Sequence, residues 1–161
     1  MKQIALIVCA GLFIAHLTAS ESSEPAAPEP TVDANQDGKV SHEEFATHHA
    51  REVFTYYDVD GDGKITKKEV EQIHQENPAH AGAAKATLKH PDIDKNKDGV
   101  ITPDELEQAA KKSPDVKTLF HGISENAPKD NWVNQAEYDS WAGDTSFDPE
   151  GQGLPVMSIS F

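Results

Sequence analysis

Three twelve-residue segments of this chain carry oxygen-bearing side chains at the same positions. Each segment has Asp at position 1, Asn or Asp at position 3, Asp at position 5, Gly at position 6 and Glu at position 12. Side chains with this spacing converge on one point if the backbone wraps around it, and Gly at position 6 allows the sharp turn that such wrapping needs. A hard cation that takes about six to eight oxygen ligands suits this arrangement. The sequence therefore predicts three calcium sites.

Each predicted site combines four side chains with the backbone carbonyl of position 7, so that the side chain at position 7 is free to vary. The loop at residues 33–44 supplies Asp33, Asn35, Asp37, Lys39 and Glu44. The loop at residues 58–69 supplies Asp58, Asp60, Asp62, Lys64 and Glu69. The loop at residues 94–105 supplies Asp94, Asn96, Asp98, Val100 and Glu105. Loop 2 has four carboxylates and loops 1 and 3 have three each, so we expect loop 2 to bind most tightly, then loop 3, then loop 1.

The same segments carry signals for the elements that must hold the loops. Position 9 is Ser or Thr in each loop, three residues before the Glu, which is the spacing of a capping box at the start of a helix. Position 8 is β-branched, as a short strand between paired loops requires. These residues are Val40, Ile65 and Ile101. Ligands, turn, strand and cap therefore agree in all three segments.

With these features the chain resembles EF-hand proteins of the calmodulin superfamily over roughly residues 33–142. The resemblance implies an all-α fold class of helix–loop–helix repeats, with short antiparallel strands between paired loops and Ca²⁺ as the ligand. In its charge, signal-like start and calcium loops, the chain is also similar to secreted EF-hand proteins of calcified extracellular matrices.

The segments between the loops predict the helices that enter and leave them. One helix over residues 45–57 would leave loop 1 and enter loop 2, residues 66–77 would leave loop 2, and an Ala-rich helix over residues 79–90 would enter loop 3. Residues 103–112 would leave loop 3, and a further apolar helix follows from Pro114. Residues 124–137 then read as a degenerate fourth hand that keeps Val133 and a cap from Asn134 to Glu137 but lacks the first Asp and the Gly. We do not expect this fourth loop to hold calcium.

Two pairings of the loops remain open from the sequence. A helix over residues 45–57 would separate loops 1 and 2 by roughly 20–25 Å, at 1.5 Å per residue. This separation favours pairing loop 2 with loop 3 and leaves loops 1 and 4 as flanks. The family resemblance favours loop 1 with loop 2 and loop 3 with loop 4, in units of residues 33–69 and 70–142, and that is the preferred expectation.

The two ends of the chain predict separate segments. Residues 1–20 combine Lys2, an apolar run over residues 4–17 and small residues at Thr18 and Ser20, which is typical of a secretory signal peptide. The run is too short for a membrane span, which needs about 20 apolar residues. Residues 21–32 read as an acidic, Pro-rich disordered leader that leaves loop 1 without an entering helix. Residues 143–161 form a tail whose apolar end we expect to fray, with self-docking as the alternative.

Composition narrows the function. A formal net charge of −14 argues against nucleic acid as a partner, since phosphates would be repelled. His42, His48 and His49 suggest zinc, but no Cys or H-E-x-x-H motif supports such a site, and no motif predicts an enzyme. We therefore expect a secreted, extracellular protein that buffers or organises calcium and could contact matrix or mineral components. The alternative is a calcium sensor that recruits a protein partner, although Met157, the one methionine after Met1, does not suggest a Met-rich groove.

Overall fold

The computed structural model describes residues 31–78, 84–124, 127–144 and 156–161. The predicted signal peptide and most of the predicted leader lie outside these residues. So do residues 79–83 of the predicted third-loop helix, residues 125–126 of the fourth loop and residues 145–155 of the tail.

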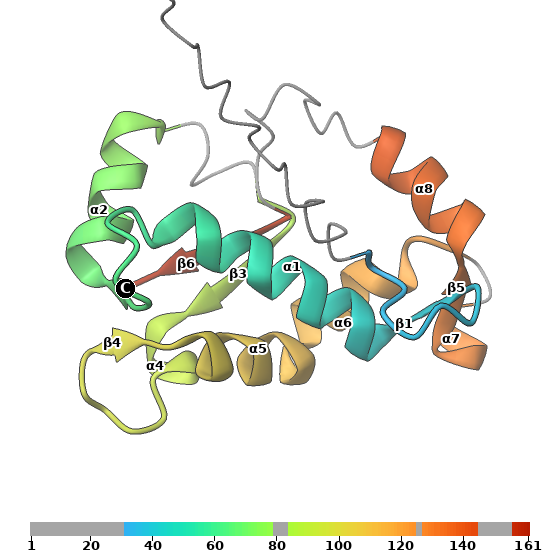
Figure 1. Ribbon diagram of the computed structural model, residues 1–161, viewed down its shortest axis with the longest axis horizontal. Helices are drawn as coiled ribbons and strands as arrows, with labels where there is room; N and C mark the ends of the chain where they lie inside the picture. The colour runs from blue at the N-terminus through green and yellow to red at the C-terminus, as the bar shows by residue number, and fades with distance from the viewer. Residues whose placement is uncertain (1–30, 79–83, 125–126, 145–155) are drawn as a thin grey trace, which may run out of the picture.

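One long helix, α1 (His42–Tyr57), connects loop 1 to loop 2, as the sequence predicts. Ser41 caps its start: the Ser41 side chain accepts a hydrogen bond from the Glu44 amide while the Glu44 side chain accepts one from the Ser41 amide. Its 16 residues give a length of ~24 Å. The two loops that it joins therefore lie at opposite ends of the helix (Figure 1).

The loops pair in an order that differs from the preferred expectation. Strand β1 (Lys39–Ser41) of loop 1 pairs antiparallel with β5 (Trp132–Asn134) of the degenerate fourth hand, with Val40 opposite Val133. Strand β2 (Ile65–Thr66) of loop 2 pairs antiparallel with β4 (Val100–Ile101) of loop 3. The expected pairing of 1 with 2 and of 3 with 4 is wrong, because the length of α1 keeps loops 1 and 2 apart. Loops 1 and 4 are also not independent flanks, since they pair with each other.

The remaining helices complete the two ends. Helix α2 (Lys67–Glu76) leaves loop 2, and α5 (Pro103–Lys112) leaves loop 3, each starting with a capping box. Helix α6 (Pro114–His121) follows at once and is capped by Ser113. The short α7 (Ala127–Asp130) and the longer α8 (Gln135–Asp144) flank β5.

Strands replace helix in front of loop 3. Residues predicted to be helical form β3 (Ala86–Lys89), and only the single turn α4 (His90–Ile93) precedes the loop. Strand β3 pairs in parallel with β6 (Met157–Ser160), with Leu88 opposite Ile159, so the tail end is docked and not frayed. The fold thus combines helices with short strands and is not plainly all-α, although its antiparallel strand pairs between loops are those expected of EF-hands.

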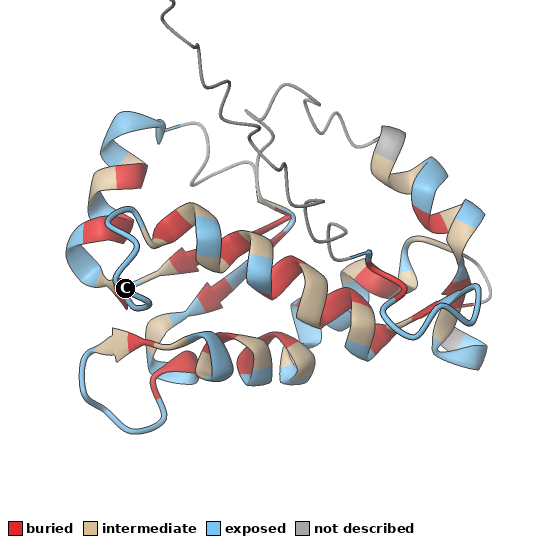
Figure 2. Cartoon of the chain, viewed as in Figure 1, coloured by how far each residue is buried: buried red, intermediate tan, exposed pale blue. Residues whose placement is uncertain are grey.

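Strand β6 is part of the hydrophobic core between α1 and α5 (Figures 1 and 2). Met157 and Ile159 have no exposed surface, and Ser158 is 2% exposed. The Ser158 hydroxyl lies 3.1 Å from that of Thr87 on β3. Strand β6 also packs against α1, whose last residue, Tyr57, is completely buried. Strand β6 therefore links α1 to β3 on the entering side of loop 3.

This burial predicts a stability effect from the tail. Ile159→Ala should lower the free energy of unfolding by about 2–5 kcal/mol, because it removes buried methyl groups and leaves a cavity. Val59→Ala is the matched control, since the Val59 side chain is 47% exposed and its truncation should cost less than about 0.5 kcal/mol. Urea unfolding in saturating Ca²⁺ measures both. Equal effects of the two substitutions would show that β6 is not part of the core.

Candidate metal centre

The first aspartate of each loop organises the backbone that surrounds the site. In loop 1, the two carboxylate oxygens of Asp33 accept hydrogen bonds from the amides of Asp37 and Gly38, at 3.2 and 2.8 Å. Asp58 accepts from the amides of Asp62 and Gly63 in loop 2, at 3.1 Å each. Asp94 does the same in loop 3 with the amides of Asp98 and Gly99, at 3.3 and 3.0 Å. The loop backbone therefore closes around the position 1 carboxylate in all three sites.

Two positions of each loop adopt left-handed backbone. The glycines at position 6, Gly38, Gly63 and Gly99, have φ of +79°, +81° and +86°. Position 4 also has positive φ, at Gln36, Gly61 and Lys97. Loop 2 alone has glycine at both positions, so it is the loop in which this backbone costs least. The glycine at position 6 predicts the left-handed backbone there, whereas the left-handed backbone at position 4 was not predicted from the sequence.

The glutamate at position 12 joins the loop to the helix that follows. In loop 2, Glu69 Oε2 accepts from the Thr66 amide at 2.8 Å and from the Thr66 hydroxyl at 2.7 Å, while Oε1 accepts from the Val59 amide at 3.0 Å. Burial alone would raise the pKa of Glu69, but its hydrogen bonds with Thr66, Asp60 and Val59 outweigh that effect and lower it. Glu44 and Glu105 make the equivalent contacts in their loops. The carboxylate that caps the helix is thus the one that closes the site.

The donor set fits calcium. In loop 2, ligand atoms of Asp58, Asp60 and Glu69 lie within 4.8 Å of one another. Asn35 and Asn96 contribute amide oxygens at the same place in loops 1 and 3, so every side chain at these positions offers oxygen, as Ca²⁺ requires. Three or four carboxylates gathered in one loop repel one another until a cation neutralises them. The role of the side chains at positions 1, 3, 5 and 12 as Ca²⁺ ligands stays a prediction, as does the contribution of the Lys39, Lys64 and Val100 carbonyls.

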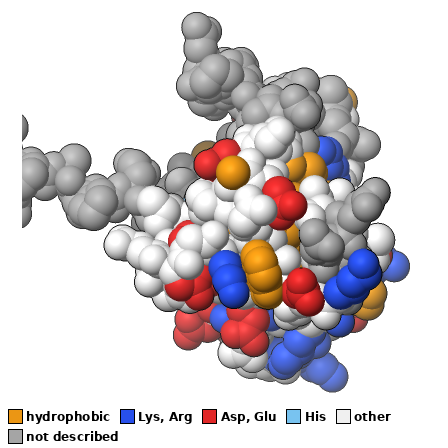
Figure 3. All heavy atoms as spheres, turned by 90° about the vertical axis from the view of Figure 1, so that its right-hand side faces the viewer, with side chains coloured by type: hydrophobic (Ala, Val, Ile, Leu, Met, Phe, Trp, Pro, Cys, Tyr) orange, Lys and Arg blue, Asp and Glu red, His pale blue; other side chains and the backbone are white. Residues whose placement is uncertain are grey.

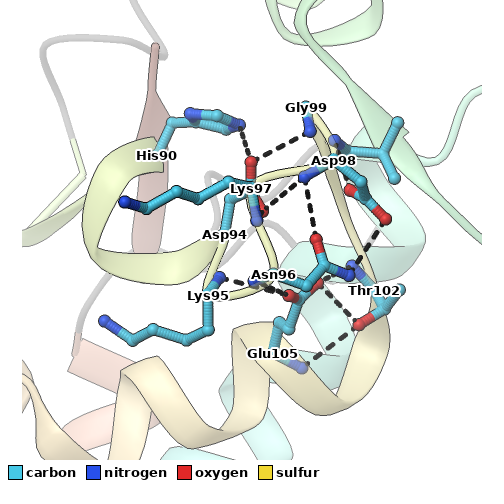
Figure 4. A network of polar contacts seen from close by, with 10 residues as sticks. His90, Asp94, Lys95, Asn96, Lys97, Asp98, Gly99, Thr102 and Glu105 are labelled. Atoms are coloured by element: carbon cyan, nitrogen blue, oxygen red, sulfur yellow. Dashed lines mark hydrogen bonds and ion pairs between the residues drawn. The ribbon is translucent and has the colours of Figure 1, made fainter.

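The tail contacts the entering side of loop 3 through His90, which lies beside Asp94 (Figure 4). The ring of Phe161 stacks on that of His90, with centroids 4.1 Å apart and planes inclined by 26°. His90 Nε2 lies 3.4 Å from Asp94 Oδ2, an ion-pair distance at which it makes no hydrogen bond. The Asp94 amide also donates to the His90 carbonyl at 2.9 Å. His90 therefore lies between the C-terminal residue and the first ligand of loop 3.

The contact between Phe161 and His90 was not predicted from the sequence, because residues 79–90 were expected to form a helix. The alternation of Ala86 and Leu88, which are buried, with Thr87 and Lys89, which are exposed, is the period-2 signal of a strand. Ala and Lys have low strand propensity, and the partner strand lies far away in the sequence. The signal was therefore present but weak.

The fourth loop keeps the frame of a hand without its ligands. Asn134 and Glu137 cap α8 reciprocally, at 2.8 and 3.1 Å, and Val133 is the paired strand residue, as predicted. Glu137 Oε1 accepts from the Ser124 hydroxyl at 3.2 Å. The turn of α7 lies where loops 1–3 have their ligands, and the sequence there lacks the Asp of position 1 and the Gly of position 6. Hand 4 therefore serves loop 1 as a structural partner.

The order of calcium affinity can be tested loop by loop. The amide protons of Gly38, Gly63 and Gly99 report on one loop each, because each donates to a position 1 carboxylate. In an NMR titration the Gly63 signal should shift at the lowest Ca²⁺ concentration, then Gly99, then Gly38. Glu69→Gln should weaken loop 2 by on the order of tenfold or more, which is about 1.4 kcal/mol. Glu105→Gln and Glu44→Gln are the matched variants in loops 3 and 1. Identical midpoints for all three signals would refute the order.

The contact between the tail and loop 3 predicts a coupling. Phe161→Ala should lower the Ca²⁺ affinity of loop 3 by about fivefold, at the weak end of coupling between sites, because His90 loses the ring that orders it beside Asp94. The same NMR titration provides the measurement through Gly99. The midpoint of Gly38 is the internal control, since loop 1 lies at the other end of α1. A Gly99 midpoint that does not move, or a shift of equal size at Gly38, would contradict the coupling.

Comparison with known proteins agrees with this geometry. A family model described as an EF-hand domain pair matches residues 47–111, and one described as an EF hand matches residues 31–47. No solved structure matches the chain significantly. Within the described residues, no helix is both long and apolar enough to cross a membrane. Residues 31–111 therefore match EF-hand domains, and EF-hand domains bind Ca²⁺.

Proposed function

We propose that this protein is secreted and acts outside the cell as a non-enzymatic calcium buffer or organiser, with a calcified matrix as its setting. The observation that carries the proposal is the combination of three oxygen-lined loops with a hydrophobic core in which the chain's own strand β6 is buried. The signal-like residues 1–20 and the net charge of −14 support the extracellular and acidic parts of the proposal.

The filled core favours a buffer over a sensor. An opening sensor exposes a Met-rich groove for its target when calcium binds. Here Met157 is completely buried in β6, and Val59 and Phe161 are the large hydrophobic side chains that are exposed in the described part of the chain. On the face drawn in Figure 3, hydrophobic side chains form small separate areas between charged ones. A partner helix would have to displace β6 before it could reach the core.

Calcium should stabilise this protein strongly without opening it. At Ca²⁺ concentrations about 100 times the Kd of a loop, each occupied loop adds about 2.7 kcal/mol to the free energy of unfolding. Extracellular modules have Kd values of about 10⁻⁴–10⁻³ M, so millimolar Ca²⁺ should raise the melting temperature and EGTA should reverse the rise. Binding of the dye ANS, which reports exposed apolar surface, should not increase with Ca²⁺.

The combined variant Glu44→Gln, Glu69→Gln and Glu105→Gln is the matched control, and Ca²⁺ should raise its melting temperature much less than that of the unmodified protein. A large rise in ANS fluorescence on adding Ca²⁺ to the unmodified protein would favour the sensor. A melting temperature that ignores Ca²⁺ would contradict the calcium-ordered fold itself.

Location and mineral contact require separate experiments. The full chain expressed in a secretion-competent cell should appear in the medium, and a variant lacking residues 2–20 should stay inside. Purified protein should slow calcium carbonate precipitation more than the combined Glu→Gln variant does. Retention of the full chain in the cell would overturn the extracellular role, and equal precipitation with both proteins would overturn the matrix role.

A further inference from the structure

A second group of metal-binding side chains lies on α1 and begins one helical turn after Glu44 of loop 1. His48, His49 and Glu52 bring two imidazole nitrogens and one carboxylate oxygen within 4.8 Å of one another. His48 Nε2 lies 3.4 Å from Glu52 Oε1, and His49 Nδ1 lies 2.6 Å from Glu52 Oε2. The helix produces this meeting, because residues three and four positions apart share one face.

Burial and hydrogen bonding fix one member of the group. His49 is 3% exposed, and its Nε2 lies 3.2 Å from the Tyr138 hydroxyl of α8. A hydroxyl both donates and accepts hydrogen bonds, so the Tyr138 hydroxyl can accept a hydrogen bond from Nε2–H when Nδ1 binds a metal. A hydrogen bond to the second ring nitrogen is the usual way in which proteins orient a histidine ligand.

The other two members leave the group open to solvent. The side chains of His48 and Glu52 are 22% and 37% exposed. The group therefore presents one carboxylate and two imidazoles, with an approach path for an ion and for a water ligand.

We propose that His48, His49 and Glu52 bind a transition-metal dication of the Zn²⁺ class, at a site independent of the calcium loops. Nitrogen donors suit Zn²⁺, whereas the oxygen-only loops suit Ca²⁺, so the two sites separate the ions by ligand type. Ligands about 2.0–2.2 Å from a tetrahedral Zn²⁺ lie about 3.4 Å from each other. The distance from Glu52 to His48 is 3.4 Å and that from Glu52 to His49 is 2.6 Å, so one ligand pair already has this spacing and the other must open slightly. Water completes the fourth position.

The proposal is tested by calorimetric titration of the full-length protein with Zn²⁺ in saturating Ca²⁺, which keeps the loops occupied. One equivalent of Zn²⁺ should bind per chain. His48→Gln and Glu52→Gln should each abolish this saturable uptake, and both residues are exposed enough for the variants to fold. Tyr138→Phe should weaken binding by about 10- to 100-fold, as loss of an outer hydrogen bond to a ligand does. His121→Gln, at the end of α6, is the matched control and should bind as the unmodified protein does.

NMR of the histidine rings in the same samples shows which histidines bind Zn²⁺. The signals of His48 and His49 should shift on adding Zn²⁺, and those of His121 should not. Zn²⁺ uptake that persists in His48→Gln and Glu52→Gln, or that disappears when Ca²⁺ saturates the loops, would overturn the site. Absence of uptake by the unmodified protein would overturn it as well.

Discussion

The fixed length of α1 is the constraint on which the arrangement of this protein depends. One helix leaves loop 1 and enters loop 2, so the two loops cannot lie side by side as neighbours in the sequence usually do. Loop 2 therefore pairs with loop 3, and loop 1 pairs with the degenerate hand far along the chain. An EF-hand loop needs a strand partner to hold its shape. Hand 4 supplies that partner to loop 1 through β5, although it lacks the Asp of position 1 and the Gly of position 6.

The local parts of the sites could be predicted from the sequence because each depends on a few adjacent residues. Asp at position 1, Gly at position 6 and the capping Glu act within twelve residues, and the structure places them as expected in all three loops. Helix α5 also begins and ends at the predicted residues, since Thr102 and Pro103 mark its start and Ser113 with Pro114 marks its end. The ordinary chemistry of caps and turns is sufficient there.

The parts that failed depend on contacts between distant residues. No residue near Val40 in the sequence predicts that Val133 is its strand partner. The resemblance to calmodulin predicted that loop 1 would pair with loop 2. Residues 86–89 have a composition that suits a helix, and they become a strand because β6 lies beside them. The grouping of His48, His49 and Glu52 required only helical spacing, yet its anchor, Tyr138, comes from the other end of the chain. Tertiary contacts outweigh local preference in each of these cases.

Two kinds of order thus meet in the same molecule. The carboxylates of each loop repel one another and need a bound cation to stay together. The core between α1 and α5 is stabilised by apolar packing and needs no cation. Tyr57 and Val53 lie in that core and lead directly into loop 2, and Ile93 leads into loop 3. The apolar framework can therefore place the loops near their final shape before the ion arrives, which reduces the ordering that binding must supply.

The position of β6 has a consequence for how the protein is made. Ribosomes release a chain from its N-terminal side onwards, and domains can begin to fold as they emerge. Thr87 of β3 and its neighbour Ser158 of β6 are 71 positions apart in the sequence, so β3 emerges well before its partner strand. During that interval the apolar residues of β3 that β6 later covers remain exposed.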